Sequence, residues 1–578
     1  MATQRSESNP GVRYEPDESP PLAVTTGLGF QFAILTITGI VLTPAIVIRA
    51  AGGTESYVSW AVFAAVLVSG TTTILQALGK ARVGAGYVLL MGTSAAFISV
   101  SIGAIAQGGP AMLGTLVVVS ALFQYALGAH LSLFRRILTP TIAGTVIMLI
   151  AVTVMPVIFD MLDDVPDGAT SSDAAITAAI TLLVIIPVAL RATGALRLWA
   201  PVLGVLAGSA AAAWVGVYDF DLVRKAAWLG IAEGNWPGLD LSFNATFWSL
   251  LPAFVFVTLV GAIETIGDAI AIQGVSWRQQ RAVDYRAVQG AVNADGTGNL
   301  LSGLLCTVPN TTYSTSVSVT ELTGVASRAV GVAIGVIFIA MAFVPKLVAL
   351  ILAIPGPVAA AYVTVLLSML FVLGMKIVIE DGIDYRKGLI VGVSFWIGVG
   401  FQNGVIFPDY FSEFAGGTLQ NGMTSGGLAA MILTLFSELT QSRSRRIEMH
   451  LEVGALPKIM EFLEQFAARH RWEGAMLDRL GAAAEETLLT LLREDEEGER
   501  ANRQLRLTAR KRDGRAILEF AAASEGGNLQ DRIALLGEPT AVGVERDMSL
   551  RLLRHFTSSV RHQQYHDGDI VTIEVEAP

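Results

Sequence analysis

Apolar runs of membrane-spanning or half-spanning length recur along the first three quarters of the chain, separated by short breaks rich in glycine, proline or charge. About fourteen such runs begin near residues 26, 57, 86, 111, 138, 174, 196, 246, 288, 309, 326, 357, 387 and 420. A straight transmembrane helix needs about 20 mostly apolar residues. The pattern therefore predicts an all-α polytopic membrane protein with about fourteen spans.

Two of these runs, 88–98 and 311–324, are too short for a straight span and are interrupted by glycine and hydroxyl residues. Each is third in a set of seven runs, the first set covering 24–218 and the second 242–441. Short, broken segments at corresponding places in two halves indicate an inverted repeat, with a ligand site between half-helix N-termini. The alternative is that glycine and proline are simply common in membrane helices.

The distribution of charge divides the chain into a membrane region and a soluble region. Hydrophobic residues make up 53% of the chain and charged residues 15%, but 44 of the 137 residues in 442–578 are charged. We therefore expect a polar tail at 1–23, a membrane region at 24–441, a basic linker at 442–446 and a soluble domain at 447–578. The net charge of −10 argues against nucleic acid as a partner. The single cysteine, Cys306, excludes an internal disulfide.

The distribution of Lys and Arg predicts the orientation in the bilayer. The tail at 1–23 lacks the apolar core of a signal peptide, which favours a cytoplasmic N-terminus. Fourteen spans from that start place thirteen Lys or Arg residues in inner loops and four in outer loops. This excess predicts a multi-pass protein of the inner (cytoplasmic) membrane with both ends in the cytoplasm.

Acidic residues inside the apolar runs are the main candidates for chemistry, because charges in a membrane are costly and rare. Glu264, Asp268, Asp295 and Glu321 lie in the second half. Glu264 and Asp268 are four residues apart and share one helix face. Two carboxylates this close in a low dielectric favour a bound proton near neutral pH. Alternatively, they make helix caps or hydrogen bonds between helices without a role in transport.

Several motifs then give the region 14–440 a family resemblance. The strongest are ADGTGNLLSGLL, VPNTTYS and LTGVASRAVG within 285–331, and weaker ones are YEPDESPP, GFQF and MGTSAAF. On these motifs the region resembles the nucleobase–ascorbate transporters, or nucleobase:cation symporter-2 family, which include uracil and xanthine permeases. The resemblance implies two inverted seven-span repeats, a core and a gate domain, a homodimer, and proton-coupled symport of a nucleobase. It implies neither an enzyme nor a cofactor.

The resemblance also implies roles for individual residues. Glu264 matches the family's glutamate that hydrogen-bonds the base and is linked to protonation. Asp268 matches the aspartate of purine-type members, and Asp295 matches the buried acid of the ninth span. The remaining matches are the strand positions of spans three and ten, namely Thr93, Ser94, Ala95, Tyr313 and Ser314.

Two departures from the family pattern concern the expected pocket. Where the family has Gln or Glu followed by Asn after the span-ten strand, this chain has Thr315 and Ser316. The Gln–His pair of span one is Gln31–Phe32. A hydroxyl reaches about 2 Å less than a glutamine side chain, so we expect a larger or wetter pocket or a different ligand. The acid pattern favours uric acid, xanthine or another oxidised purine, with a non-nucleobase substrate as the alternative.

The soluble region predicts a small α/β domain. Residues 456–472 and 475–494 have the pattern of amphipathic helices, and 503–522 alternates around a turn at Asp513–Gly514 like a β-hairpin. Residues 548–577 predict a helix followed by one strand. This order resembles the ATP-binding fold of anti-sigma-factor kinases and histidine kinases, called GHKL.

The nucleotide-binding positions of that fold are degenerate here. Glu486 matches the catalytic glutamate, but Thr490 stands where the family has a magnesium-binding asparagine, and 521–528 lacks the adenine-reading aspartate. We therefore expect a regulatory domain, with a membrane-tethered sensor or kinase as the alternative function. Three histidines, His555, His562 and His566, are more typical of a solvated helix and turn than of a metal site.

Overall fold

The structure is a computed structural model. It describes residues 11–80, 82–131, 139–165, 170–231, 234–279, 281–380, 382–407, 421–439, 445–472, 474–493, 504–512, 514–522, 530, 551–566 and 568–576. The chain divides into two compact units. The larger unit consists of Gly11–Ser276 and Gly290–Phe436, and the smaller contains Trp277–Gln289 and the chain from Ser437 onward.

The described residues in the first half of the larger unit form helices and one short strand. Its elements are α1 (Leu22–Ala50), α2 (Glu55–Leu78), β1 (Leu90–Thr93), the 3-10 helix η1 (Ala95–Phe97), α3 (Ile98–Ala129), α5 (Pro140–Thr153), α6 (Met155–Asp160), α7 (Ser171–Arg191), α8 (Ala195–Leu198), α9 (Ala200–Val215) and α10 (Phe220–Lys225). Helix α3 is interrupted at Gly109, whose φ of 78° is left-handed and which precedes Pro110. Because proline removes a backbone donor and glycine tolerates that φ, α3 consists of two helical segments.

The second half repeats the order of long helices with one short strand. Its elements are α11 (Ala245–Ser276), α12 (Tyr285–Leu304), β2 (Asn310–Tyr313), α13 (Thr315–Thr323), α14 (Arg328–Ala342), α15 (Pro345–Leu352), α16 (Gly356–Glu380), α17 (Tyr385–Gln402) and α20 (Gly422–Leu439). Helices α14 and α15 meet at a bend of 84°. As in the first half, a short strand leads directly into a helix.

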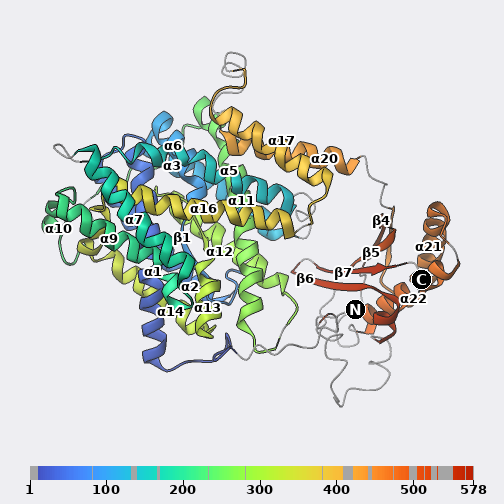
Figure 1. The fold of residues 1–578 in the computed structure, drawn as a ribbon. Coiled ribbons are helices and arrows are strands. Elements are labelled where there is room, and N and C mark those ends of the chain that lie inside the picture. Colours follow the sequence, from blue (N-terminus) through green and yellow to red (C-terminus); the bar gives the residue numbers. More distant parts are fainter. Residues whose placement is uncertain are drawn as a thin grey trace. The chain divides into compact units, whose positions relative to one another are not determined.

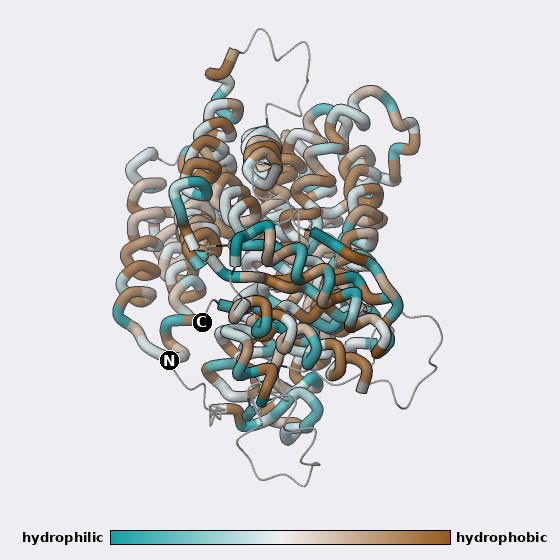
Figure 2. The backbone as a smooth tube through the Cα atoms, turned by 90° about the vertical axis from the view of Figure 1, so that its right-hand side faces the viewer, coloured by the Kyte–Doolittle hydropathy of each residue, from teal (hydrophilic) through white to brown (hydrophobic). Residues whose placement is uncertain are grey.

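The helices of the larger unit have the apolar character of membrane spans. Within the described part of the chain, seven helices are long and apolar enough to cross a membrane, or eight if α14 and α15 form one bent span. Large apolar side chains on α7, α9, α17 and α20 are exposed, among them Leu183, Leu206, Trp396 and Phe436. Brown, hydrophobic residues dominate the long helices in Figure 2. A polytopic helical membrane protein is thereby confirmed, whereas the number of fourteen spans stays a prediction.

The helices of the larger unit, labelled in Figure 1, pack in two groups. Helices α1, α2, α3, α11 and α14 pack around β1 and β2, and α5, α7, α9, α16 and α17 pack with one another. Glycines allow the closest approaches. A Cβ on Gly70 of α2 would lie 2.6 Å from the carbonyl oxygen of Gly335 on α14. A Cβ on Gly144 of α5 would lie 2.5 Å from that of Gly374 on α16, so backbones touch in both groups.

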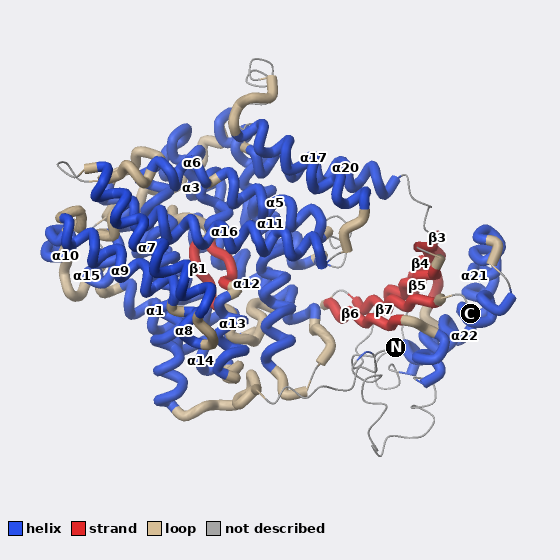
Figure 3. The backbone as a smooth tube through the Cα atoms, viewed as in Figure 1, coloured by secondary structure: helices blue, strands red, loops and turns tan. Residues whose placement is uncertain are grey.

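In the described part of the smaller unit, a five-stranded antiparallel sheet packs with helices α21 (Leu456–His470) and α22 (Gly474–Arg493), and residues 551–556 form a short helical turn (Figure 3). The strands are β3 (Arg445–His450), β4 (Gln504–Arg512), β5 (Arg515–Ala522), β6 (Ser559–Tyr565) and β7 (Gly568–Val575), in the order β3-β4-β5-β7-β6. Apolar side chains of both helices and of the central strands form one core, including Phe462, Phe466, Leu480, Leu507 and Phe520.

Three sequence predictions for the smaller unit can be compared with these elements. The two amphipathic helices and the hairpin around Gly514 are confirmed, while Asp513 lies outside the described residues. The prediction of a single strand near the C-terminus is wrong, because 559–575 forms the β6–β7 hairpin. The polar run His562–Gln564 hides the alternation that marks a strand in sequence.

The start of the sheet also differs from the expected boundary. Arg445 and Arg446 belong to β3, so the sheet begins inside the basic stretch that we expected to be a linker. The sheet is antiparallel throughout among the described strands. The likeness of this unit to an ATP-binding fold stays a prediction.

Candidate functional site

The two short strands of the larger unit pair with each other. β1 and β2 are antiparallel, with Leu90 opposite Tyr313 and Thr93 opposite Asn310. η1 and α3 follow β1, and α13 follows β2. The two broken segments that stand out in the sequence are thus brought together, with the first turns of two helices beside them. The first N–H groups of a helix lack intrahelical acceptors and can bind a polar ligand.

Hydroxyl groups tie the strand pair to its surroundings. The Tyr313 hydroxyl donates to the carbonyl oxygen of Thr93 at 3.0 Å. The Ser316 Oγ donates to the Tyr313 carbonyl at 2.6 Å and accepts from the Leu90 backbone N at 2.8 Å. A Cβ on Gly92 would collide with the Tyr313 ring. The site therefore requires glycine at position 92 and a small hydroxyl at position 316.

Asp268 fixes helix α11 to strand β2. Its carboxylate is buried and accepts hydrogen bonds from Thr312 Oγ1 and Ser314 Oγ, both at 2.7 Å. Both donors come from the end of β2, where α13 begins. Because its oxygens are engaged by the protein, Asp268 holds the strand in place.

Asp295 is the centre of a second buried network. Its Oδ2 accepts from Gln124 Nε2 of α3 and from Thr265 Oγ1 of α11, both at 2.7 Å. Asn299 Nδ2 donates to Gln124 Oε1 at 2.7 Å, and Asn299 Oδ1 accepts from the Asn310 backbone N at 2.7 Å. The network connects α3, α11, α12 and β2, and it satisfies the charge of Asp295 internally.

Glu264 differs from the other two acids. It is partly buried on α11, and its charge interacts with those of Asp268 and Asp295. It also interacts electrostatically with Tyr313. Among the described residues, no donor forms a hydrogen bond with the Glu264 carboxylate. This carboxylate is therefore free to accept hydrogen bonds from a ligand.

The structure gathers most of the residues singled out from the sequence. The three acids lie with the strand positions Thr93, Ser94, Ala95, Tyr313 and Ser314. Thr315 is partly buried at the start of α13, whereas Ser316 is fully buried. Through its two hydrogen bonds, Ser316 forms a strut between Leu90 of β1 and Tyr313 of β2. Glu321 is exposed on α13.

Gln31 and Phe32 are not brought to the strand pair. Helix α1 reaches the strands at Gly39 and Ile40, whose carbonyl oxygens accept from Thr93 Oγ1 at 3.2 and 3.3 Å. Eight helical residues separate Gln31 from Gly39, which is about 12 Å along the axis. Phe32 is fully buried in the core.

Other residues of the site were not predicted from the sequence. Asn299 follows Asp295 by one helical turn, a spacing that allows contact between the two side chains. Their shared partner Gln124 lies 171 residues from Asp295, so no local pattern could indicate it. Tyr362 of α16 is another: a Cβ on Gly39 would be 3.4 Å from the hydroxyls of both Tyr313 and Tyr362. Tyr362 belongs to the second packing group, so the site lies where the two groups meet.

Two further polar atoms at β2 are unsatisfied. The Oδ1 of Asn310 and the Oγ1 of Thr311 are buried without a hydrogen-bond partner in the described part of the chain. Buried oxygens of this kind usually bind water or a ligand. A separate apolar cavity of about 310 Å³ lies between α1, α9 and α15, lined mainly by residues such as Val205, Leu206 and Ile351. It offers no charged group.

The chain is similar in sequence to a known protein family and to several named transporters. Residues 24–405 match the model of the Permease family. The chain is 28% identical over 457 residues to the xanthine permease XanP of Escherichia coli, covering 75% of this chain and 95% of that protein. It is 28% identical over 442 residues to the uric acid permease PucK of Bacillus subtilis, covering 73% and 97%. It is 27% identical over 433 residues to a putative purine permease of Clostridium perfringens, covering 73% and 92%.

A solved structure is also similar. The transmembrane domain of the cyanobacterial bicarbonate transporter BicA is 16% identical, with a TM-score of 0.44, covering 73% of this chain and all of that chain.

Proposed function

Because this chain belongs to the Permease family, we propose that it is a secondary transporter that carries a purine-type nucleobase, such as uric acid or xanthine, together with protons. Relatives named for xanthine, uric acid and purine match nearly their whole length. The observation that carries the proposal is the Glu264 carboxylate, which has no donor in the described structure and lies beside two acids that have theirs.

Recognition of a base follows from the groups around the strand pair. A purine edge alternates N–H donors and carbonyl acceptors, so it needs acceptors and donors in fixed positions. We assign the acceptor to Glu264 and the donors to the first N–H groups after β1 and β2, near Ala95 and Thr315. Thr93, Ser94, Tyr313 and Ser314 shape this edge of the pocket, and the short Thr315 side chain leaves room for a ligand or water.

Coupling to protons rests on the three carboxylates. Asp268 and Asp295 accept hydrogen bonds that stabilise their charged forms. A third negative charge at Glu264 is repelled by both in a low-dielectric interior. Binding of a proton at Glu264 relieves this repulsion, which links the occupancy of the proton and base sites. The alternative is that sodium, not the proton, is the coupling cation, and the uptake experiment below distinguishes the two.

Movement of the two packing groups would expose the site alternately to the two sides of the membrane. We assign the group with α1, α2, α3, α11 and α14 as the core, and the group with α5, α7, α9, α16 and α17 as the gate. Tyr362 reaches the strand pair from the gate, which supports a site at their interface. The matching order of elements in the two halves supports two inverted seven-span repeats.

The expected setting is the inner membrane, with both termini in the cytoplasm and two copies associated through the gate. The lipid bilayer covers the exposed apolar side chains of α7, α9, α17 and α20. In the C-terminal domain, Thr490 is buried and its hydroxyl donates to the Glu486 carbonyl at 2.7 Å. A hydroxyl used in this way does not replace a magnesium-binding asparagine, which supports a regulatory domain without catalysis.

The experiment is uptake by the purified full-length protein in proteoliposomes. Labelled xanthine and uric acid should accumulate under an inward proton gradient, and a protonophore should abolish accumulation. Uracil, ascorbate and bicarbonate serve as competitors that report selectivity. Accumulation driven by a sodium gradient alone would overturn proton coupling. If no nucleobase is taken up or competes, the assigned substrate class is wrong.

A further inference from the structure

The loop between α11 and α12, together with the first residues of α12, groups with the C-terminal domain. We call this segment, Trp277–Gln289, the connector. Its own contacts give it a defined form, since the Arg281 guanidinium lies 3.7 Å from the centroid of the Trp277 ring. Asp284 Oδ1 accepts from the backbone N and the Nε of Arg286, at 2.9 and 3.2 Å, and so caps the start of α12.

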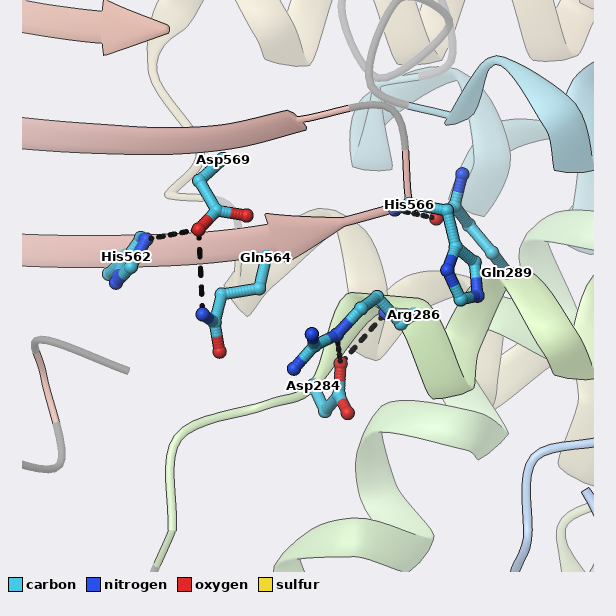
Figure 4. A network of polar contacts seen from close by, with 7 residues as sticks. All are labelled: Asp284, Arg286, Gln289, His562, Gln564, His566 and Asp569. Atoms are coloured by element: carbon cyan, nitrogen blue, oxygen red, sulfur yellow. Dashed lines mark hydrogen bonds and ion pairs between the residues drawn. The ribbon is translucent and has the colours of Figure 1, made fainter. Parts of the chain in front are cut away.

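The β6–β7 hairpin carries buried polar residues close to its turn. His562 and Asp569 are almost fully buried, and His562 Nε2 lies 3.2 Å from Asp569 Oδ2. Gln564 Nε2 donates to the same oxygen at 3.5 Å (Figure 4). Our expectation of a solvated histidine on a helix or turn is therefore wrong for His562. Hairpin tips usually lie in water, but here Gln564 and Tyr565 are buried beside the exposed His566, so one side of the tip is covered.

The connector provides part of that cover. The backbone N of His566, at the hairpin turn, donates to Gln289 Oε1 at 2.8 Å, as Figure 4 shows. The Tyr565 ring lies 5.0 Å from the Tyr285 ring, tilted by 41°. Tyr285 and Gln289 are four residues apart and so share one face of the first turns of α12. The hairpin tip thus contacts one helical face through a ring contact and a partly buried hydrogen bond.

We propose that the β6–β7 tip is a regulatory docking surface whose partner is the connector of the same chain, and that docking slows the transport cycle. The connector joins α11, which carries Glu264 and Asp268, to α12, which carries Asp295. Gln289 precedes Asp295 by six helical residues, about 9 Å along the axis. A contact made in one conformation favours that conformation by its own free energy, so docking restrains the helix pair. This inference rests on the proposed transport function.

Hydrogen–deuterium exchange of the full-length protein tests the docking itself. In Tyr565→Ala the ring contact is lost, and we expect the connector amides to exchange about tenfold faster than in the unaltered protein. Protection of β4 and β5 should stay unchanged, which shows that the domain is still folded. Arg561→Ala is the matched control, because this exposed residue lies on the same strand away from the tip. Unchanged exchange of the connector in Tyr565→Ala would overturn the proposal.

Cross-linking tests the docking without weakening it, and covers the case in which Tyr565→Ala unfolds the domain. In a Cys306→Ser background, Tyr285→Cys with Tyr565→Cys should be joined by a short bismaleimide. Tyr285→Cys with Gln465→Cys, on α21, should not be joined. Failure to cross-link the first pair, or equal cross-linking of both, contradicts the docking.

Uptake then tests the regulation. We expect about threefold faster initial uptake in Tyr565→Ala, and uptake slowed about tenfold or more by the cross-link, each with an unchanged half-saturating concentration. A cross-linked protein that transports at the normal rate would disprove that docking restrains the α11–α12 pair. If the unaltered protein transports no base, the proposed function fails separately. In that case hydrogen–deuterium exchange still tests the restraint. The α12 amides beyond Gln289 should exchange more slowly in the cross-linked protein, and unchanged exchange there would contradict the restraint.

Discussion

At the scale of single residues, three acids close to one another have different surroundings. Asp268 and Asp295 each accept two hydrogen bonds of 2.7 Å, and Glu264 has no donor among the described residues. Acids with internal partners hold elements together, whereas an acid without one is available to a ligand. On this difference we propose that Glu264 binds the ligand and that the other two acids position the elements around it.

The first prediction concerns Glu264→Gln. The amide cannot take up the coupled proton and binds a base N–H less strongly, so we expect affinity to fall about tenfold to a hundredfold and coupled uptake to be lost. The melting temperature should hardly change, because no hydrogen bond of the described structure is removed. Uptake and melting curves measure both effects. Glu321→Gln, at an exposed acid, is the control, and full uphill uptake by Glu264→Gln would disprove the assignment.

The second prediction separates Thr315 from Ser316. Thr315→Gln restores a longer donor and acceptor at the pocket, and should shift competition toward xanthine or uric acid while the protein stays folded. Ser316→Asn removes the strut between Leu90 and Tyr313, so we expect it to cost about 1–3 kcal/mol of stability. Ligand competition and thermal unfolding are the measurements. Ser318→Asn, at an exposed position of α13, is the control for the second change.

If Thr315→Gln left the ligand profile unaltered, the pocket would lie elsewhere. If Ser316→Asn matched the stability of Ser318→Asn, the strut would have no energetic importance.

At the scale of elements, the N-terminal segment 11–18 holds the junction between α13 and α14. Tyr14 pairs in parallel with Val325, and the Arg328 backbone N donates to the Pro16 carbonyl at 3.0 Å. The Arg328 guanidinium contacts Asp17 at 2.8 Å and donates to the Gly86 carbonyl at 2.7 Å, just before β1. One side chain therefore joins the N-terminal segment, α14 and the approach to β1.

The third prediction follows from this junction. Arg328→Ala should lower the stability of the membrane unit by about 1.5–3 kcal/mol, because two charge-assisted contacts are lost together. Asp17→Asn should have a smaller effect, since the exposed ion pair contributes little and the Gly86 bond remains. Thermal unfolding in detergent ranks the variants. Arg386→Ala, at the start of α17, is the control, and equal stability of Arg328→Ala and this control would contradict the prediction.

At the scale of the whole molecule, the chain combines a membrane unit with a second unit that includes the connector and the C-terminal domain. Each unit has its own hydrophobic core, and the strand pair with its three acids belongs to the membrane unit. Binding of the ligand should therefore survive removal of the C-terminal domain. The rate of the transport cycle should change, because the connector loses its partner.

The fourth prediction is that truncation after Leu439, at the end of α20, preserves base binding within about twofold and changes the uptake rate. A cut after Arg446 would leave β3 as an unpaired strand, since β3 begins at Arg445. Ligand-induced thermal shifts and initial uptake rates measure the two effects. Loss of all binding in a folded truncated protein would place part of the site in the removed domain.

ATP hydrolysis gives a second readout for that domain. The full-length protein should show none, because Thr490 is occupied within its helix. Hydrolysis that disappears in Glu486→Ala would instead make the C-terminal domain a catalyst.

The sequence by itself determined the class of protein, the two broken segments, and the three acids. These depend on local composition and on the period of apolar residues, which a linear pattern records. Only the tertiary structure decided which acid lacks a partner, because the donors to Asp268 and Asp295 come from distant residues such as Ser314 and Gln124. The same holds for the strut at Ser316 and for the connector contact at Gln289, 277 residues from His566. Hydrogen bonds over such separations depend on how elements pack, and no local period encodes that packing.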